Sequence, residues 1–150
     1  MSLSQAVRNK LAASLILSDA CEEYCQDMKI AERDYRNAIT LAEVTAKLAW
    51  EKAGEEYARA SAPAASMYEA AITHKDFPDT GRVDAWRHFR AHIAPALSLF
   101  RVAGEDADRE RDISIAAAER ALEAALDTGW WVFSDRREGA LEKLHATATA

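Results

Sequence analysis

The fold is decided by residues 19–61, which read DACEEYCQDMKIAERDYRNAITLAEVTAKLAWEKAGEEYARAS. Apolar residues return along this stretch at steps of three and four, which places them on one side of an α-helix. They are Cys21, Cys25, Met28, Ala31, Tyr35, Ala38, Ile39, Ala42, Ala46, Ala49, Ala53, Tyr57 and Ala60. A single helix of this length measures about 65 Å, whereas a small domain is about 30 Å wide. We therefore expect the helix to pair with long neighbouring helices or to reach out to a partner.

The composition of the chain favours helices throughout. Its 150 residues are enough for about one domain, and we expect a single domain that folds without disulfides or a metal. Glycine and proline are scarce, at 5 and 3 residues, while alanine, which has the highest intrinsic helix propensity, is abundant. The alternation of β-branched and aromatic residues that is typical of strands is missing. The sequence therefore predicts an all-α protein.

Turn-forming and helix-breaking residues divide the first part of the chain into two antiparallel helical segments joined by a loop. We expect a short helix at residues 1–17 and a long helix over residues 19–75 that is kinked at Pro63. A loop at residues 76–81 follows, because aspartate, proline and glycine gather there. Return helices over residues 82–128 then run back along the long helix. Together these segments predict a long antiparallel helical hairpin.

The C-terminal part adds an aromatic connector at residues 129–135 and a short helix at residues 136–147. The short N- and C-terminal helices would then pack beside the hairpin and give a coiled-coil-like, up-down helical bundle. We identify no internal repeat of fixed period. Two positions for a break in the long helix, Gly54 and Pro63, stay open.

The charge of the chain limits the classes of partner. A net charge of -6 disfavours a general nucleic-acid binder, which usually carries an excess of basic residues. No apolar run is long enough for a membrane span, and the first residues lack the apolar core of a signal peptide. We therefore expect a cytoplasmic protein, of bacterial or phage type. Cys21 and Cys25 lie on one helix turn, an awkward geometry for a disulfide, and we expect them to be small packed hydrophobic residues.

An aromatic cluster near the C-terminus is the best candidate for a contact surface. Trp130, Trp131 and Phe133 lie within four residues, and adjacent tryptophans cannot both face the same side of a helix. Aromatic side chains are enriched at the energetic centres of protein interfaces. The alternative is that these rings cap the protein's own core, where they bury large areas.

A second group of candidate residues lies at helical spacing in the return helices. Asp84, His88 and His92 are four residues apart and share one helix face. Carboxylate and imidazole groups at this spacing are possible metal ligands, although they supply three ligands at most. The alternative is a set of surface histidines beside charged residues, and we expect no metal and no cofactor.

The same segment suggests an enzymatic alternative. Residues 87–92 read RHFRAH, which resembles the Arg-polar-x3-His motif of the HEPN family of all-helical, often dimeric ribonucleases of toxin and defence systems. The resemblance implies a composite site across a dimer, in which Arg87 and His92 act and His92 helps to move a proton of the RNA 2′-hydroxyl. Histidine is suited to such proton transfer near neutral pH. The alternative is a solvated helix face.

Taken together, these observations favour a binding protein over an enzyme. Apolar helix stripes that are not covered within the chain favour self-association or docking onto a protein partner. We expect an adaptor, an inhibitor, a chaperone or an assembly component of a larger bacterial or phage complex. The alternative is a HEPN-like, metal-independent ribonuclease, and nucleic acid is an expected partner only in that case.

Overall fold

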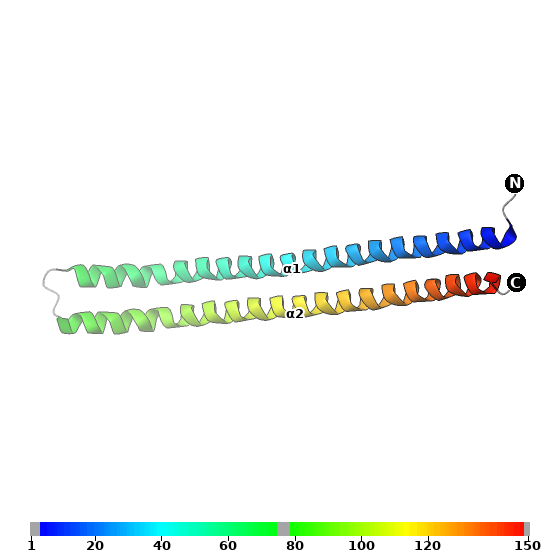
Figure 1. Ribbon diagram of the computed structural model, residues 1–150. Coiled ribbons are helices and arrows are strands. Elements are labelled where there is room, and N and C mark those ends of the chain that lie inside the picture. Colours follow the sequence, from blue (N-terminus) through cyan, green and yellow to red (C-terminus); the bar gives the residue numbers. More distant parts are fainter. Residues whose placement is uncertain (1–3, 75–78, 149–150) are drawn as a thin grey trace. The chain divides into compact units, whose positions relative to one another are not determined.

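A computed structural model describes residues 4–74 and 79–148, with side chains for residues 4–74 and 81–146. It contains two long helices, α1 (Gln5–Thr73) and α2 (Asp79–Ala148), and no strand occurs in these ranges (Figure 1). The two helices are antiparallel and pack against each other, so the predicted all-α hairpin is confirmed. Of the predicted loop at residues 76–81, residues 76–78 lie outside the described part, and residues 79–81 belong to α2.

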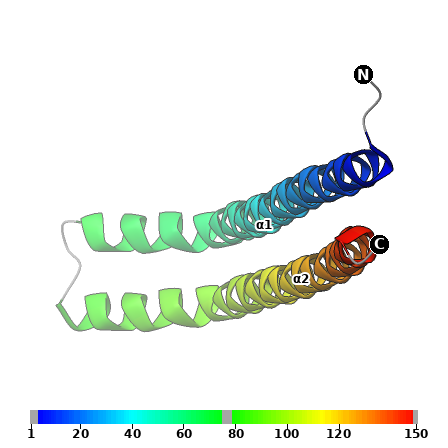
Figure 2. The same cartoon turned by 45° about the vertical axis from the view of Figure 1, so that its right-hand side comes forward.

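The contacts of the chain fall into two compact units, whereas the sequence predicted a single domain. The first unit combines Met1–Ile39 with Ile115–Ala150, and the second is formed by Thr40–Ser114. In each unit a segment of α1 packs on a segment of α2 (Figure 2). The contacts described below all lie within one unit or the other.

The predicted short terminal helices are not separate elements. α1 begins after Ser4, whose Oγ accepts a hydrogen bond from the Val7 backbone at 3.4 Å, and it then continues through the predicted break at residue 18. α2 likewise continues through Gly104 and Gly129. A glycine inside a helix costs about 1 kcal/mol relative to alanine. Both glycines lie against an aromatic ring of α1, and at Gly104 the Trp50 ring occupies the space that a Cβ would need.

The two prolines of the described region also lie inside helices. Pro63 belongs to α1 and Pro95 to α2, and both occupy exposed positions. Neither ends its helix, and the kink expected at Pro63 stays a prediction. Cys21 and Cys25 are exposed rather than packed, because α2 covers a different side of α1.

The buried positions reveal an internal repeat, so the expectation of no repeat was wrong. Every eleventh residue of α1 from position 20 onward is alanine, and every eleventh residue of α2 from position 85 onward is alanine or glycine. These small residues are Ala20, Ala31, Ala42, Ala53 and Ala64 in α1, and Ala85, Ala96, Ala107, Ala118, Gly129 and Ala140 in α2. Among the described side chains, seven of the ten buried residues belong to this set, and the other three are Ala13, Ala46 and Gly104. Eleven residues over three turns give about 3.67 residues per turn, which keeps the set on one side of each helix.

Large residues follow the small ones at a constant distance and meet across the two helices. Tyrosines stand four residues after Ala20, Ala31, Ala53 and Ala64, and phenylalanine or leucine follows most of the small residues of α2. The facing pairs are Tyr24 with Phe133 (ring centroids 5.1 Å apart), Tyr57 with Phe100 (5.6 Å) and Tyr68 with Phe89 (5.3 Å). Small residues beside these pairs leave room for the rings, so the two helices fit by alternation of small and large side chains.

One layer of the repeat departs from this pattern. The position that tyrosine would occupy is Ala46, and the large residue nearby is Trp50. Its ring packs directly on Gly104, where a built Cβ would overlap the six-membered ring. The indole Nε1 of Trp50 donates a hydrogen bond to Asp108 Oδ1 at 3.1 Å, and Arg111 Nη1 donates to the same oxygen at 3.2 Å. A polar network therefore replaces an aromatic pair in this layer.

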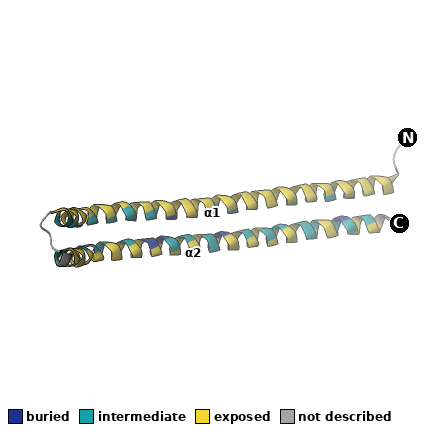
Figure 3. Ribbon diagram, turned by 60° about the vertical axis from the view of Figure 1, so that its left-hand side comes forward, coloured by how far each residue is buried: buried dark blue, intermediate teal, exposed yellow. Residues whose placement is uncertain are grey.

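Few residues of the helix pair are buried, and most are exposed or intermediate (Figure 3). All hydrophobic residues classed as buried are alanines, and among the described side chains no large one is fully buried. The exposed large hydrophobic residues include Leu41, Leu99 and Trp131, which are 68%, 72% and 74% exposed. The contact between two helices therefore leaves much apolar surface uncovered.

Candidate functional site

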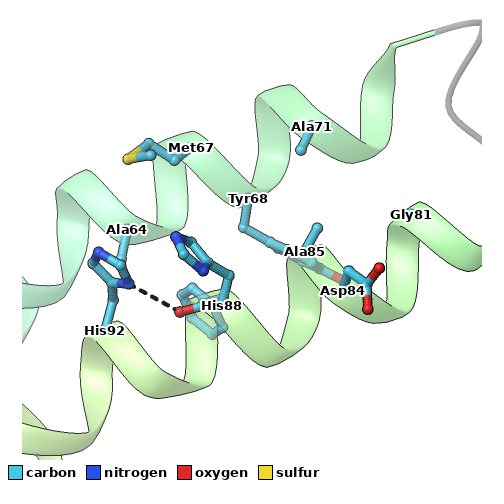
Figure 4. Close-up of a pocket in the computed structure, with 10 residues that line it drawn as sticks. Ala64, Met67, Tyr68, Ala71, Gly81, Asp84, Ala85, His88 and His92 are labelled. Atoms are coloured by element: carbon cyan, nitrogen blue, oxygen red, sulfur yellow. Dashed lines mark hydrogen bonds between the residues drawn. The ribbon is translucent and has the colours of Figure 1, made fainter.

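In the second unit, a pocket of about 470 Å³ lies between the two helices (Figure 4). Its lining includes two small residues of the repeat, Ala64 and Ala85, together with Ala71, Met67 and Tyr68. The tyrosine and phenylalanine rings fill the middle of the contact between the helices. The alanines beside them are too short to fill the remaining space, which leaves the pocket. Its lining is mainly apolar, which suits an apolar side chain of a partner.

The pocket recurs at the same positions of the repeat. A second pocket of about 340 Å³ in the second unit is lined by Ala53, Tyr57, Ala60, Ala96 and Leu99, which are eleven residues away from their counterparts in the first pocket. A third, of about 180 Å³, is lined by Ala31, Tyr35, Ala38, Ala118 and Ala121 in the first unit. The repeat therefore generates hollows at a regular interval. The two pockets of the second unit are called the hollow face below.

The two histidines predicted at helical spacing both line the first pocket. The imidazole rings of His88 and His92 extend from α2 towards the turn of α1 that carries Ala64 (Figure 4). Their centroids are 4.7 Å apart, and the Nδ1–H of His92 donates a hydrogen bond to the His88 backbone carbonyl at 3.0 Å. His92 lines the second pocket as well. The structure thus places His92 at the middle of the hollow face.

The weakly predicted metal site is not assembled. Asp84 and the two histidines line one pocket, but among the side chains that the structure describes no three His, Cys, Asp or Glu residues are grouped closely enough to hold a metal. The hydrogen bond of His92 Nδ1 to the backbone leaves Nε2 as the ring nitrogen of His92 that could bind a metal. The spacing was therefore correct for one face but insufficient for coordination.

The residues of the ribonuclease motif are not brought into one site within the chain. His92 lines the hollow face, whereas Arg87 is exposed and lines none of the three pockets. Five residues along a regular helix turn the side chain by about 140°, which explains the separation.

The C-terminal aromatic cluster is divided between the helix contact and the surface. Phe133 stacks on Tyr24 with centroids 5.1 Å apart, and Trp130 meets the same tyrosine edge-on at 6.1 Å. Trp130 is still half exposed, and Trp131 is 74% exposed. Arg136 pairs with Glu23 beside the cluster. Phe133 therefore belongs to the chain's own packing, while the tryptophans present rings to the outside.

The hollow face itself was missed by the sequence analysis. Its floor is made of alanines, which carry no chemical signal of their own, and its existence depends on which alanines of α1 and α2 lie side by side. The signal that could have found it was the spacing of eleven residues, shared by both helices.

Comparison with known proteins gives no family assignment. No protein-family model, curated protein or solved structure matches the chain. Within the described residues, neither helix carries an apolar segment of the length needed to cross a membrane.

Proposed function

We propose that the chain is a non-enzymatic protein-binding protein: an adaptor, inhibitor, chaperone or assembly component of a larger bacterial or phage complex. One observation carries the proposal. The chain exposes 11335 Å² of accessible surface, whereas a compact monomer of 16.6 kDa exposes about 7,600 Å². The excess includes many large hydrophobic side chains, and exposed apolar surface of this extent favours contact with protein.

The chemistry of the surface supports a protein partner over nucleic acid. The net charge of -6 opposes binding to a phosphate backbone. The hollows are lined mainly by alanine and aromatic residues, which suit apolar side chains. We infer that the helices associate in a coiled-coil-like manner, with an eleven-residue period in place of the heptad.

Two tryptophans are the proposed anchors in the first unit. Trp131 is 74% exposed and Trp130 50%, although tryptophan is usually highly buried. Tryptophan side chains contribute strongly to binding when a partner covers them. Phe133 acts differently, because it holds α2 against Tyr24 and would position the anchors without contacting the partner.

The proposal is tested by recovering tagged protein from its native host and identifying bound proteins by mass spectrometry. We expect a stoichiometric partner that is lost with Trp131→Ala and retained with Val83→Ala, a matched control because Val83 is also an exposed apolar residue of α2. Circular dichroism would show that both variants stay helical. Equal recovery of the partner with both variants would remove the aromatic anchor from the proposal, and absence of any partner would contradict the proposal.

A HEPN-like ribonuclease is the second candidate. The observation that favours it is the position of His92, which lines two pockets and lies beside His88. If the chain cleaves RNA, Arg87→Ala and His92→Ala should each abolish cleavage while helix content stays unchanged. Equal activity of both variants and the wild type would exclude the residues of this motif from the reaction.

A further inference from the structure

We infer that the hollow face of the second unit is covered by the same face of a second copy of this chain. The inference rests on the proposed protein-binding function and names the partner for one surface. Three properties of the described residues carry it: the amount of uncovered surface, the spacing of the hollows, and the low charge of this face.

The uncovered surface is large enough for a stable dimer. The chain exposes about 3,700 Å² more than a compact monomer of its mass. Obligate homodimers bury about 2,000–5,000 Å² counted over both chains. Part of the excess on each copy therefore suffices for such an interface. A pair of helices whose buried residues are alanines and one glycine gains more from such burial than a protein with its own large core.

The spacing of the hollows selects a second copy among protein partners. Each hollow carries one large exposed apolar residue, three residues after an alanine of the repeat: Met67 follows Ala64 and is 62% exposed, and Leu99 follows Ala96 and is 72% exposed. The same position on the facing helix holds His88 in the first hollow and Glu56 in the second. The two hollows are one repeat apart, or about 16 Å along a helix. A copy related by a twofold axis brings projecting residues and hollows with the same interval. An unrelated partner would have to match this interval independently.

The charge of the face permits contact between identical chains. Two copies that each carry a net charge of -6 repel each other where acidic side chains meet. The lining of each pocket contains one acidic residue, which is Asp84 in the first pocket and Glu56 in the second. Much of the chain's acidic excess therefore lies outside this face, which makes it a favourable place for self-association.

The inference is tested by measuring the mass and dissociation constant of the full chain by analytical ultracentrifugation. We expect the wild type to be a dimer and Leu99→Glu to raise the dissociation constant at least about 100-fold, because the variant places a charge in the hollow face of each copy. The matched control is Leu97→Glu. Residue 97 lies two positions away on α2, about 200° around the helix, and lines none of the pockets. We expect this control to stay dimeric.

Other outcomes overturn the inference. A monomeric wild type at the highest soluble concentration would do so, and so would a Leu99→Glu variant that stays dimeric. Dissociation of both variants also counts against it, because the loss would then follow from weakened helices and not from one face. The proposed function is judged separately: capture of the host partner by a monomeric chain would leave that function standing while the dimer failed.

Discussion

Gly104 in the second unit and Gly129 in the first both lie against an aromatic ring of α1, but at different distances. At Gly104 a methyl group would overlap the ring of Trp50, whereas at Gly129 it would lie 3.7 Å from the ring of Tyr24, an ordinary van der Waals contact. Both glycines lie inside the alanine-rich helix α2. Glycine is therefore required at residue 104, where the Trp50 ring leaves no room for a methyl group, whereas at residue 129 there is room for alanine.

The largest effect on stability is expected from Gly104→Ala. The added methyl group must displace the Trp50 ring, together with the indole hydrogen bond to Asp108. We expect a loss of about 1–3 kcal/mol in unfolding free energy, as for other overpacked sites. Thermal unfolding followed by circular dichroism measures this loss. If the overlap is the cause, Trp50→Leu should restore part of the stability in the double variant, and an unchanged melting temperature for Gly104→Ala would show that the ring moves freely.

A smaller effect is expected from Asp108→Ala. Asp108 Oδ1 accepts hydrogen bonds from Trp50 at 3.1 Å and from Arg111 at 3.2 Å. Removal of this oxygen leaves two donors to solvent, and because the site is only partly buried we expect a loss of about 1 kcal/mol. Chemical denaturation provides the free energy, and Asp112→Ala is the control because Asp112 pairs with Arg111 without touching Trp50. Equal losses in both variants would assign the effect to Arg111 alone.

The smallest effects are gains in stability at the glycines that lack a close neighbour. No heavy atom would lie within 4 Å of a Cβ at Gly139, and Gly129 has the ordinary contact with Tyr24. Alanine at either position should raise the unfolding free energy by up to about 1 kcal/mol through helix propensity. A lower melting temperature for Gly129→Ala with a higher one for Gly139→Ala would show that Tyr24 packs more tightly than its distance indicates.

The sequence was sufficient for the hairpin and insufficient for its internal order. The steps of three and four from Cys21 to Ala60 define a helix because only residues on one side need to be apolar. The same steps fit periods of 3.5, 3.6 and 3.67 over short windows, so the eleven-residue repeat was concealed among the other alanines. The breaks placed at residue 18 and at Gly129 were wrong, because α1 and α2 continue through them; at Gly129, local propensity ignores the ring of Tyr24 that packs on the glycine from the other helix.

For the candidate sites too, the sequence predicted local neighbours within one helix but not contacts between the two helices. Helical spacing correctly placed His88 and His92 next to each other, since this is a local property of one helix. Whether Phe133 faces Tyr24 or a partner depends on the pairing of residues that lie far apart in the sequence. The exposure of Trp131 is consistent with the predicted contact surface, which stays a prediction until a partner is measured.

The constant pairing of Tyr24 with Phe133, Tyr57 with Phe100 and Tyr68 with Phe89 has a consequence for changes in chain length. An insertion or deletion in α1 alone shifts every later tyrosine away from its partner on α2. A deletion of eleven residues from α1, matched by the eleven residues that face them on α2, keeps the remaining tyrosine and phenylalanine rings opposite each other. Homologues of this chain should therefore differ in length by such matched pairs of segments, twenty-two residues at a time.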